Sequence, residues 1–352
     1  MRLAYAPVML HFKQPAGTSR GILTEKPTYL LKIYDEHDPS HFGLGEASVF
    51  PGLSPEADGY YEYKLVELLA NIALGKPTDL SRHSSIQLGL EEAIRDYASG
   101  CRGIYFDSPF THGEETLTIN GLVWMGNREE MLARAEEKLR GGFRCVKFKI
   151  GALDWNQEFS MLKEIRSLQD ASKLEMRVDA NGGFTPENVM NRLEDLATLQ
   201  VHSIEQPLPR GHYKEMARVC KESPVDIALD EELIGLYTDE ERLRMLDEIS
   251  PRYIILKPSL CGGFSGSLDW IEKARERNIG WWITSALESN IGLNAISQFA
   301  ASLNVEMPQG LGTGSLFTQN FETPLRLEGE HLSYHPELKP EREALKNLDW
   351  RE

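Results

Sequence analysis

Residues 145–150, with the sequence Cys-Val-Lys-Phe-Lys-Ile, have the pattern of a buried β-strand that carries two lysines. Side chains alternate along a strand, so Lys147 and Lys149 share the inner face while the apolar residues between them face the other way. Burying two ammonium groups is costly unless opposite charges lie nearby. The stretch therefore predicts a barrel strand that ends, at Lys149, in a charged site.

Short apolar runs of this kind recur after about residue 116, and helical stretches separate them. The predicted strands are 122–124, 145–150, 176–180, 201–205, 227–230, 253–257, 281–286 and 310–312. The clearest predicted helices are 129–140, 186–199, 239–249 and 268–277. Eight strands with seven intervening helices are typical of a closed barrel rather than of an open sheet. We therefore expect an α/β fold, a modified (β/α)7β TIM-like barrel, over residues 116–324.

The first 110 residues have a different pattern. Extended segments near 3–13, 28–34 and 42–50 precede two helical stretches, 62–74 and 86–99. Strands followed by segregated helices predict a small α+β domain, which we expect to cap the barrel. The polar tail, about 325–352, is expected to pack on this capping domain. Residues 14–21 and 50–60 are the candidates for a lid over the barrel mouth.

Charged residues stand at the ends of five successive predicted strands: Lys149, Asp179, Glu205, Asp230 and Lys257. They lie 30, 26, 25 and 27 residues apart, which is one βα unit each time. In a closed parallel barrel such residues converge on one mouth, where barrel enzymes have their active sites. Any one of them alone is explained equally well as a helix cap or a solvated rim residue. Three consecutive carboxylates between two lysines favour a functional site.

Asp179, Glu205 and Asp230 provide an oxygen-only set of metal ligands. None of the nine histidines falls in the regularly spaced positions, which favours Mg²⁺, or Mn²⁺, over zinc, copper or iron. A glycosidase is disfavoured because it needs two carboxylates and would leave both lysines without a role. A barrel that binds a ligand without chemistry would be expected to lack one or more of the five charges.

The composition restricts the partners of the chain. Its 38 Lys and Arg against 54 Asp and Glu give a net charge of −16, which disfavours nucleic acid and anionic membranes as partners. No apolar run is long enough to span a membrane. The four cysteines have no CxxC spacing, which predicts reduced thiols in a cytoplasmic protein. A small-molecule carboxylate is the expected ligand.

Five motifs resemble those of the muconate-lactonising subgroup of the enolase superfamily. Lys147-Phe148-Lys149 is similar to its KxK motif. The others are similar to its DAN, EQP, DE and KP motifs: Asp179-Ala180-Asn181, Glu205-Gln206-Pro207, Asp230-Glu231 and Lys257-Pro258. The resemblance covers nearly the whole chain and implies an N-terminal capping domain on a barrel that binds Mg²⁺.

Within this subgroup the chain is similar to the o-succinylbenzoate synthases of menaquinone biosynthesis. The similar segments are residues 43–54, 283–289 and 309–313, although Gly312 stands where an Asp is often found. The resemblance implies syn dehydration of 2-succinyl-6-hydroxy-2,4-cyclohexadiene-1-carboxylate to 2-succinylbenzoate. The alternative is an N-succinylamino acid racemase or a dipeptide epimerase. Residues 310–316 lack the Asp-x-Asp motif usual in dipeptide epimerases, which counts against that activity.

The resemblance also implies roles for individual residues. Asp179, Glu205 and Asp230 would hold the metal ion. Lys149 would remove the α-proton and return a proton to the departing hydroxyl, while Lys257 would stabilise the enediolate from the opposite face. The remaining expected site residues are the deeper lysine, Lys147, two that support the metal site, Asn181 and Glu231, and four that orient substrate, Arg177, Thr284, Ser285 and Gly310.

Overall fold

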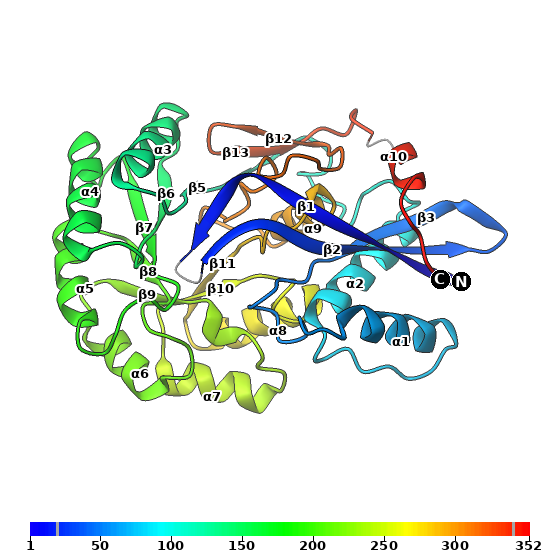
Figure 1. Ribbon diagram of the computed structural model, residues 1–352, viewed down its shortest axis with the longest axis horizontal. Helices are drawn as coiled ribbons and strands as arrows, with labels where there is room; N and C mark the ends of the chain where they lie inside the picture. The colour runs from blue at the N-terminus through cyan, green and yellow to red at the C-terminus, as the bar shows by residue number, and fades with distance from the viewer. Residues whose placement is uncertain (19–20, 340–341) are drawn as a thin grey trace.

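The computed structural model describes residues 1–18, 21–339 and 342–352, and a curled parallel sheet lies at its centre (Figure 1). The seven strands of this sheet are neighbours in chain order, and every adjacent pair runs parallel. They are β5 (Gly121–Val123), β6 (Cys145–Lys149), β7 (Glu175–Asp179), β8 (Ser203–Glu205), β9 (Asp226–Leu229), β10 (Tyr253–Leu256) and β11 (Gly280–Ile283).

Two isolated bridges close the sheet into a barrel. Thr284, just after β11, pairs with Gly310, and the adjacent Gln309 pairs with Ile119, just before β5. The eighth strand predicted at 310–312 is thus present only as bridge pairing at 309–310. A Cβ at Gly310 would lie 2.5 Å from the Thr284 hydroxyl oxygen, so this close pairing requires glycine. The predicted fold class, a modified (β/α)7β TIM-like barrel with an N-terminal α+β domain, is confirmed.

Helices follow the barrel strands and cover the outer surface of the sheet (Figure 1). They are α3 (Arg128–Arg140), α4 (Trp155–Leu168), α5 (Val189–Thr198), α6 (Tyr213–Glu222), α7 (Asp239–Ile249), α8 (Gly263–Glu276) and α9 (Asn290–Ser302). Helix α8 begins five residues before its predicted start at 268, because its first turn is rich in glycine and serine and lacks apolar periodicity. In the described part of the chain, no helix has the length and apolar character needed to cross a bilayer.

The N-terminal region is a three-stranded antiparallel sheet with two helices packed against it. Its elements are β1 (Arg2–Thr18), β2 (Gly21–Asp35), β3 (Asp38–Ala47), α1 (Tyr61–Ala73) and α2 (Ser84–Ala98). Residues 14–18 continue β1 and so lie in a hairpin rather than in the free loop expected for a lid, while residues 19–20 lie outside the described chain. This hairpin reaches the barrel, where Gly17 pairs with Met125.

The tail contacts both parts of the molecule. Strands β12 (Leu325–Glu328) and β13 (His331–Tyr334) form a small sheet with β4 (Thr116–Thr118), which precedes the barrel. Beyond α10 (Glu343–Lys346), Arg351 pairs with Tyr5 of the N-terminal sheet, and the two ends of the chain lie side by side (Figure 1). The domain boundaries 1–110 and 116–324 stay predictions.

We expect Gly45→Ala to lower the free energy of unfolding by about 3 kcal/mol, because an added Cβ on β3 would lie 2.0 Å from the Gly89 carbonyl oxygen of α2. Urea unfolding followed by circular dichroism measures the change. Gly59→Ala is the control, because a Cβ there meets no atom within 4 Å and should change stability by less than about 0.5 kcal/mol. Equal stability of the two variants would show that α2 can move away from β3 at little cost.

Candidate active site

The five regularly spaced charges meet at one end of the barrel. Lys149, Asp179 and Glu205 are the last residues of β6, β7 and β8, and they are direct partners across these neighbouring strands. Asp230 and Lys257 follow the last residues of β9 and β10. All five are buried, so the convergence predicted from spacing is present in the structure.

Each carboxylate is paired directly with a lysine. The Nζ atom of Lys149 donates to Asp179 Oδ2 at 2.5 Å, and Lys147 Nζ donates to Glu205 Oε2 at 2.7 Å. Lys257 donates in the same way to Asp230. Every carboxylate at the mouth thus has an ammonium group beside it, which offsets the cost of removing the charges from water.

The pKa values of Asp179 and Glu205 shift in opposite directions at this site. Burial would raise the pKa of Asp179, but the ammonium groups of Lys149 and Lys147 outweigh burial and lower it. Burial and the Asp179 carboxylate together raise the pKa of Glu205 to about 7. Glu205 lies on the strand between Asp179 and Asp230, so it carries most of the repulsion within the set.

Carboxylate oxygens that lack a hydrogen-bond partner show whether these residues could hold a divalent cation. In the described ranges, no three His, Cys, Asp or Glu side chains are already arranged around a common point. The donor set is nevertheless oxygen-only, and Glu205 Oε1 is buried without a hydrogen-bond partner among the described residues. Lys257 Nζ lies 4.0 Å from that oxygen. A hard cation would supply the missing partner, so the residues present fit one.

Asn181 and Glu231 lie directly behind this set. The Asn181 side chain accepts a hydrogen bond from Lys149 Nζ at 2.9 Å and donates one to Glu231 Oε1 at 3.0 Å. Its backbone N–H donates to Asp179 Oδ1 at 3.0 Å. Asn181 thus fixes the position of both a lysine and a carboxylate, as a supporting residue would.

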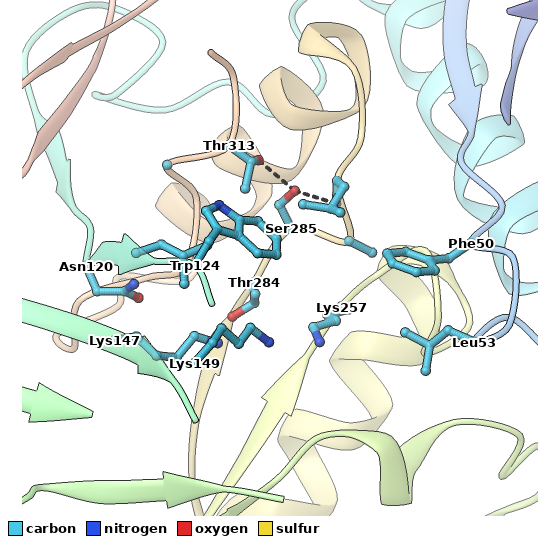
Figure 2. A pocket seen from close by; sticks show the side chains of 15 residues that line it. Phe50, Leu53, Asn120, Trp124, Lys147, Lys149, Lys257, Thr284, Ser285 and Thr313 are labelled. Carbon is cyan, nitrogen blue, oxygen red and sulfur yellow. Dashed lines mark hydrogen bonds between the residues drawn. The ribbon is translucent and has the colours of Figure 1, made fainter. Parts of the chain in front are cut away.

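A cavity opens above the charges, and Figure 2 shows Lys147 and Lys149 entering it from one side and Lys257 from the other. Three predicted substrate contacts, Thr284, Ser285 and Gly310, line its wall. The remaining lining residues are Phe50, Leu53, Asn120, Leu122, Trp124, Ala286, Leu287, Gly312 and Thr313.

Arg177 points into the barrel as strand parity predicts, but it is not among the residues that line the cavity. It pairs in register with Lys147, one layer below Asp179. Its guanidinium donates to Glu175 at 2.7 Å and to the Pro308 carbonyl at 3.0 Å, and it lies 4.3 Å from the centre of the Trp282 ring. These contacts hold the guanidinium outside the cavity lining, and the predicted substrate contact of Arg177 stays a prediction.

Several lining residues were not predicted from the sequence. Phe50 and Leu53 come from the capping domain and lie in the lid candidate 50–60. Asn120 precedes β5; its Nδ2 donates to the Gly121 carbonyl at 2.9 Å, while its buried Oδ1 has no partner among the described residues. Asn120 lies outside the strand predicted at 122–124, so strand parity gave no indication of its direction.

The three buried carboxylates and the facing lysines at the mouth are the arrangement of a barrel enzyme. Comparison with known proteins supports this class. A family model, Enolase C-terminal domain-like, matches residues 130–337. The chain belongs to the enolase superfamily, which confirms the prediction from its motifs.

A curated relative and a crystal structure are similar to almost the whole chain. The chain is 44% identical over 363 residues to o-succinylbenzoate synthase of Desulfotalea psychrophila, covering 94% of this chain and 98% of the relative. The crystal structure of MenC from the same organism superimposes with a TM-score of 0.85 at 40% identity, covering 95% of this chain and 99% of that one.

An epimerase is less similar to this chain in sequence. The chain is 27% identical to L-Ala-D/L-Glu epimerase of Bacillus subtilis, over 86% of this chain and 85% of the relative.

We expect Gly310→Ala to destabilise the protein by about 1–3 kcal/mol, because its Cβ would lie 2.5 Å from Thr284 Oγ1 and 2.9 Å from Thr284 Cγ2. Thr284→Ala removes both atoms, so the double variant should regain much of the loss. Urea unfolding of both single variants and the double variant gives the coupling energy. Additive effects would mean that the strain at Gly310 comes from the backbone and not from Thr284.

Proposed function

We propose that the protein is an o-succinylbenzoate synthase that dehydrates 2-succinyl-6-hydroxy-2,4-cyclohexadiene-1-carboxylate to 2-succinylbenzoate. The observation that carries this proposal is the placement of Lys149 and Lys257 on opposite sides of one cavity, beside three buried carboxylates. The 44% identical relative favours dehydration over the epimerase activity of the 27% identical one.

The cofactor that suits this site is Mg²⁺, with Mn²⁺ as the substitute. Asp179, Glu205 and Asp230 would hold it, since they supply three buried carboxylates at adjacent strand ends. Use of Mg²⁺ together with a lysine or histidine base is a general feature of the superfamily. When bound, the ion neutralises the substrate carboxylate and so lowers the energy of the enediolate that proton removal creates.

The lysines would move and balance the protons. Lys149 Nζ takes the α-proton of the substrate as the C–H bond breaks. The same ammonium returns a proton to the C6 hydroxyl on the same face, so that the C–O bond breaks, water leaves and the ring becomes aromatic. Lys257 holds a positive charge against the enediolate from the opposite side. Lys147, 2.7 Å from Glu205, holds that carboxylate in position.

The cavity walls would bind and shield the substrate. Phe50, Leu53 and Trp124 present apolar surface that excludes water from the reactive intermediate. Thr284, whose Oγ1 is buried without a partner among the described residues, would donate to a substrate oxygen. The partner is thus a small-molecule carboxylate, and a cytoplasmic location stays a prediction.

We expect Lys149→Ala to lower the rate of dehydration by roughly 10²- to 10⁴-fold, the usual contribution of a positioned base. Ultraviolet absorbance follows the loss of the cyclohexadiene. Lys163→Ala, which changes an exposed lysine of α4, is the control and should retain full activity.

Undiminished dehydration by Lys149→Ala would refute its role as the base. A wild-type protein that leaves the cyclohexadiene unchanged but epimerises N-succinylamino acids or dipeptides would refute the proposed function in favour of its alternative.

Removal of the cation should abolish activity, and Mg²⁺ should restore it. We expect Asp230→Asn to weaken Mg²⁺ binding by more than the roughly 10- to 100-fold that accompanies loss of a supporting residue, because it removes a charged ligand. Isothermal titration calorimetry on EDTA-treated protein measures the affinity. Asp226→Asn is the matched control, since this exposed carboxylate lies at the opposite end of β9. Full activity after exhaustive EDTA treatment would contradict the metal assignment.

A further inference from the structure

Glu288 is a fully buried carboxylate, in the loop between β11 and α9, to which the proposed chemistry gives no role. Its two oxygens accept three hydrogen bonds. Oε1 accepts from the Ser259 hydroxyl, and Oε2 accepts from the Ser285 hydroxyl at 2.7 Å and the Ala286 N–H at 2.8 Å. Because all of these groups are buried, their bonds hold the loops that carry them.

The bond from Ser259 connects Glu288 to Lys257. Ser259 lies two residues beyond Lys257, in the turn that leads to α8. The Lys257 carbonyl accepts from the N–H groups of Leu260 at 2.8 Å and Cys261 at 3.0 Å, so residues 257–261 form one tight turn. Ser259 is itself fully buried and does not line the cavity. Its bond to Glu288 therefore fixes the turn rather than a ligand.

The bond from Ser285 connects Glu288 to the cavity wall. The Ser285 hydroxyl also accepts from the Thr313 hydroxyl at 2.8 Å, and both residues line the cavity (Figure 2). It accepts a further bond from the N–H of Leu287, whose φ of 63° is uncommon for a residue other than glycine. The loop is thus held in a strained conformation by bonds that converge on Glu288.

The capping domain holds the next residue, Ser289. Its hydroxyl donates to Glu46 Oε2 at 2.5 Å, and its N–H donates to Glu46 Oε1 at 2.9 Å. Glu46, at the end of β3, also accepts from the Thr28 hydroxyl at 2.8 Å. The residue next to Glu288 is therefore anchored by hydrogen bonds to the N-terminal sheet.

We propose that Glu288 is a positioning residue that sets the place of the Lys257 ammonium through Ser259. This inference rests on the proposed function only in taking Lys257 as a group that acts on the substrate. The Glu288 carboxylate only accepts hydrogen bonds, which suits three converging donors. A displacement of Lys257 by about 1 Å costs up to roughly 100-fold in rate.

The test compares Ser259→Ala, Glu288→Gln and the double variant in the Mg²⁺-loaded protein. Ser259→Ala removes one hydroxyl and should lower kcat about tenfold with KM little changed. Glu288→Gln should lower kcat at least as much. The double variant should lose no more than Glu288→Gln alone, because both changes break the same connection.

Two matched variants report a merely structural effect. Ser267→Ala removes another fully buried hydroxyl nearby, which donates to the Gly263 carbonyl at 2.7 Å within α8. Glu92→Gln changes another fully buried carboxyl group, whose pKa burial and the nearby Glu46 raise well above its usual range. Both should keep the wild-type kcat.

A crystal structure of Ser259→Ala provides a readout that needs no substrate. The inference predicts that residues 257–261 shift while α8 stays in place. An unmoved Lys257, or a kcat equal to that of Ser267→Ala, would overturn it. If the wild-type protein does not dehydrate the cyclohexadiene, the proposed function fails, yet the position of Lys257 in the variant still tests the connection to Glu288.

Discussion

The buried ion pairs at the barrel mouth are the constraint on which the rest of the structure depends. Lys149 with Asp179, Lys147 with Glu205 and Lys257 with Asp230 are all buried, and none of these charges would be tolerated there alone. The barrel brings three carboxylates and three lysines from five strands, β6 to β10, to one point. The close Thr284–Gly310 pairing therefore supports these ion pairs, since it closes the barrel that brings the charges together.

The capping domain strengthens these interactions from above. Phe50 and Leu53 add apolar side chains to the cavity wall, and an apolar wall strengthens the charge interactions next to it. The cap can do this because Glu46 attaches it to the start of α9. The same attachment lies beside Glu288, so neighbouring buried hydrogen bonds hold both the capping domain and the turn at residues 257–261.

The periodic features of the protein were predictable from its sequence. Strand ends near Lys149, Asp179 and Glu205 repeat once per βα unit, so their convergence followed from counting alone. The eighth strand was predicted at 310–312, but its bridge pairing lies at 309–310. The sequence did not locate it because a two-residue bridge shows no alternation of polar and apolar residues. Asn120 lies outside the predicted strands, and Phe50 lies beyond β3, which ends at Ala47 and not at the predicted 50, so the pattern did not indicate which way these side chains point.

Arg177 shows most clearly what strand parity cannot supply. Parity places Arg177 and Lys147 on the inner face, in register with each other, yet only Lys147 lines the cavity. The difference lies in the partners: Glu175, Pro308 and Trp282 hold the guanidinium from below. Arginine suits this lower layer because it stays charged, stacks on an aromatic ring and does not exchange protons at ordinary pH. Lys147 lies in this same layer but lines the cavity, so the partners of a side chain, and not its depth alone, decide whether it reaches the cavity.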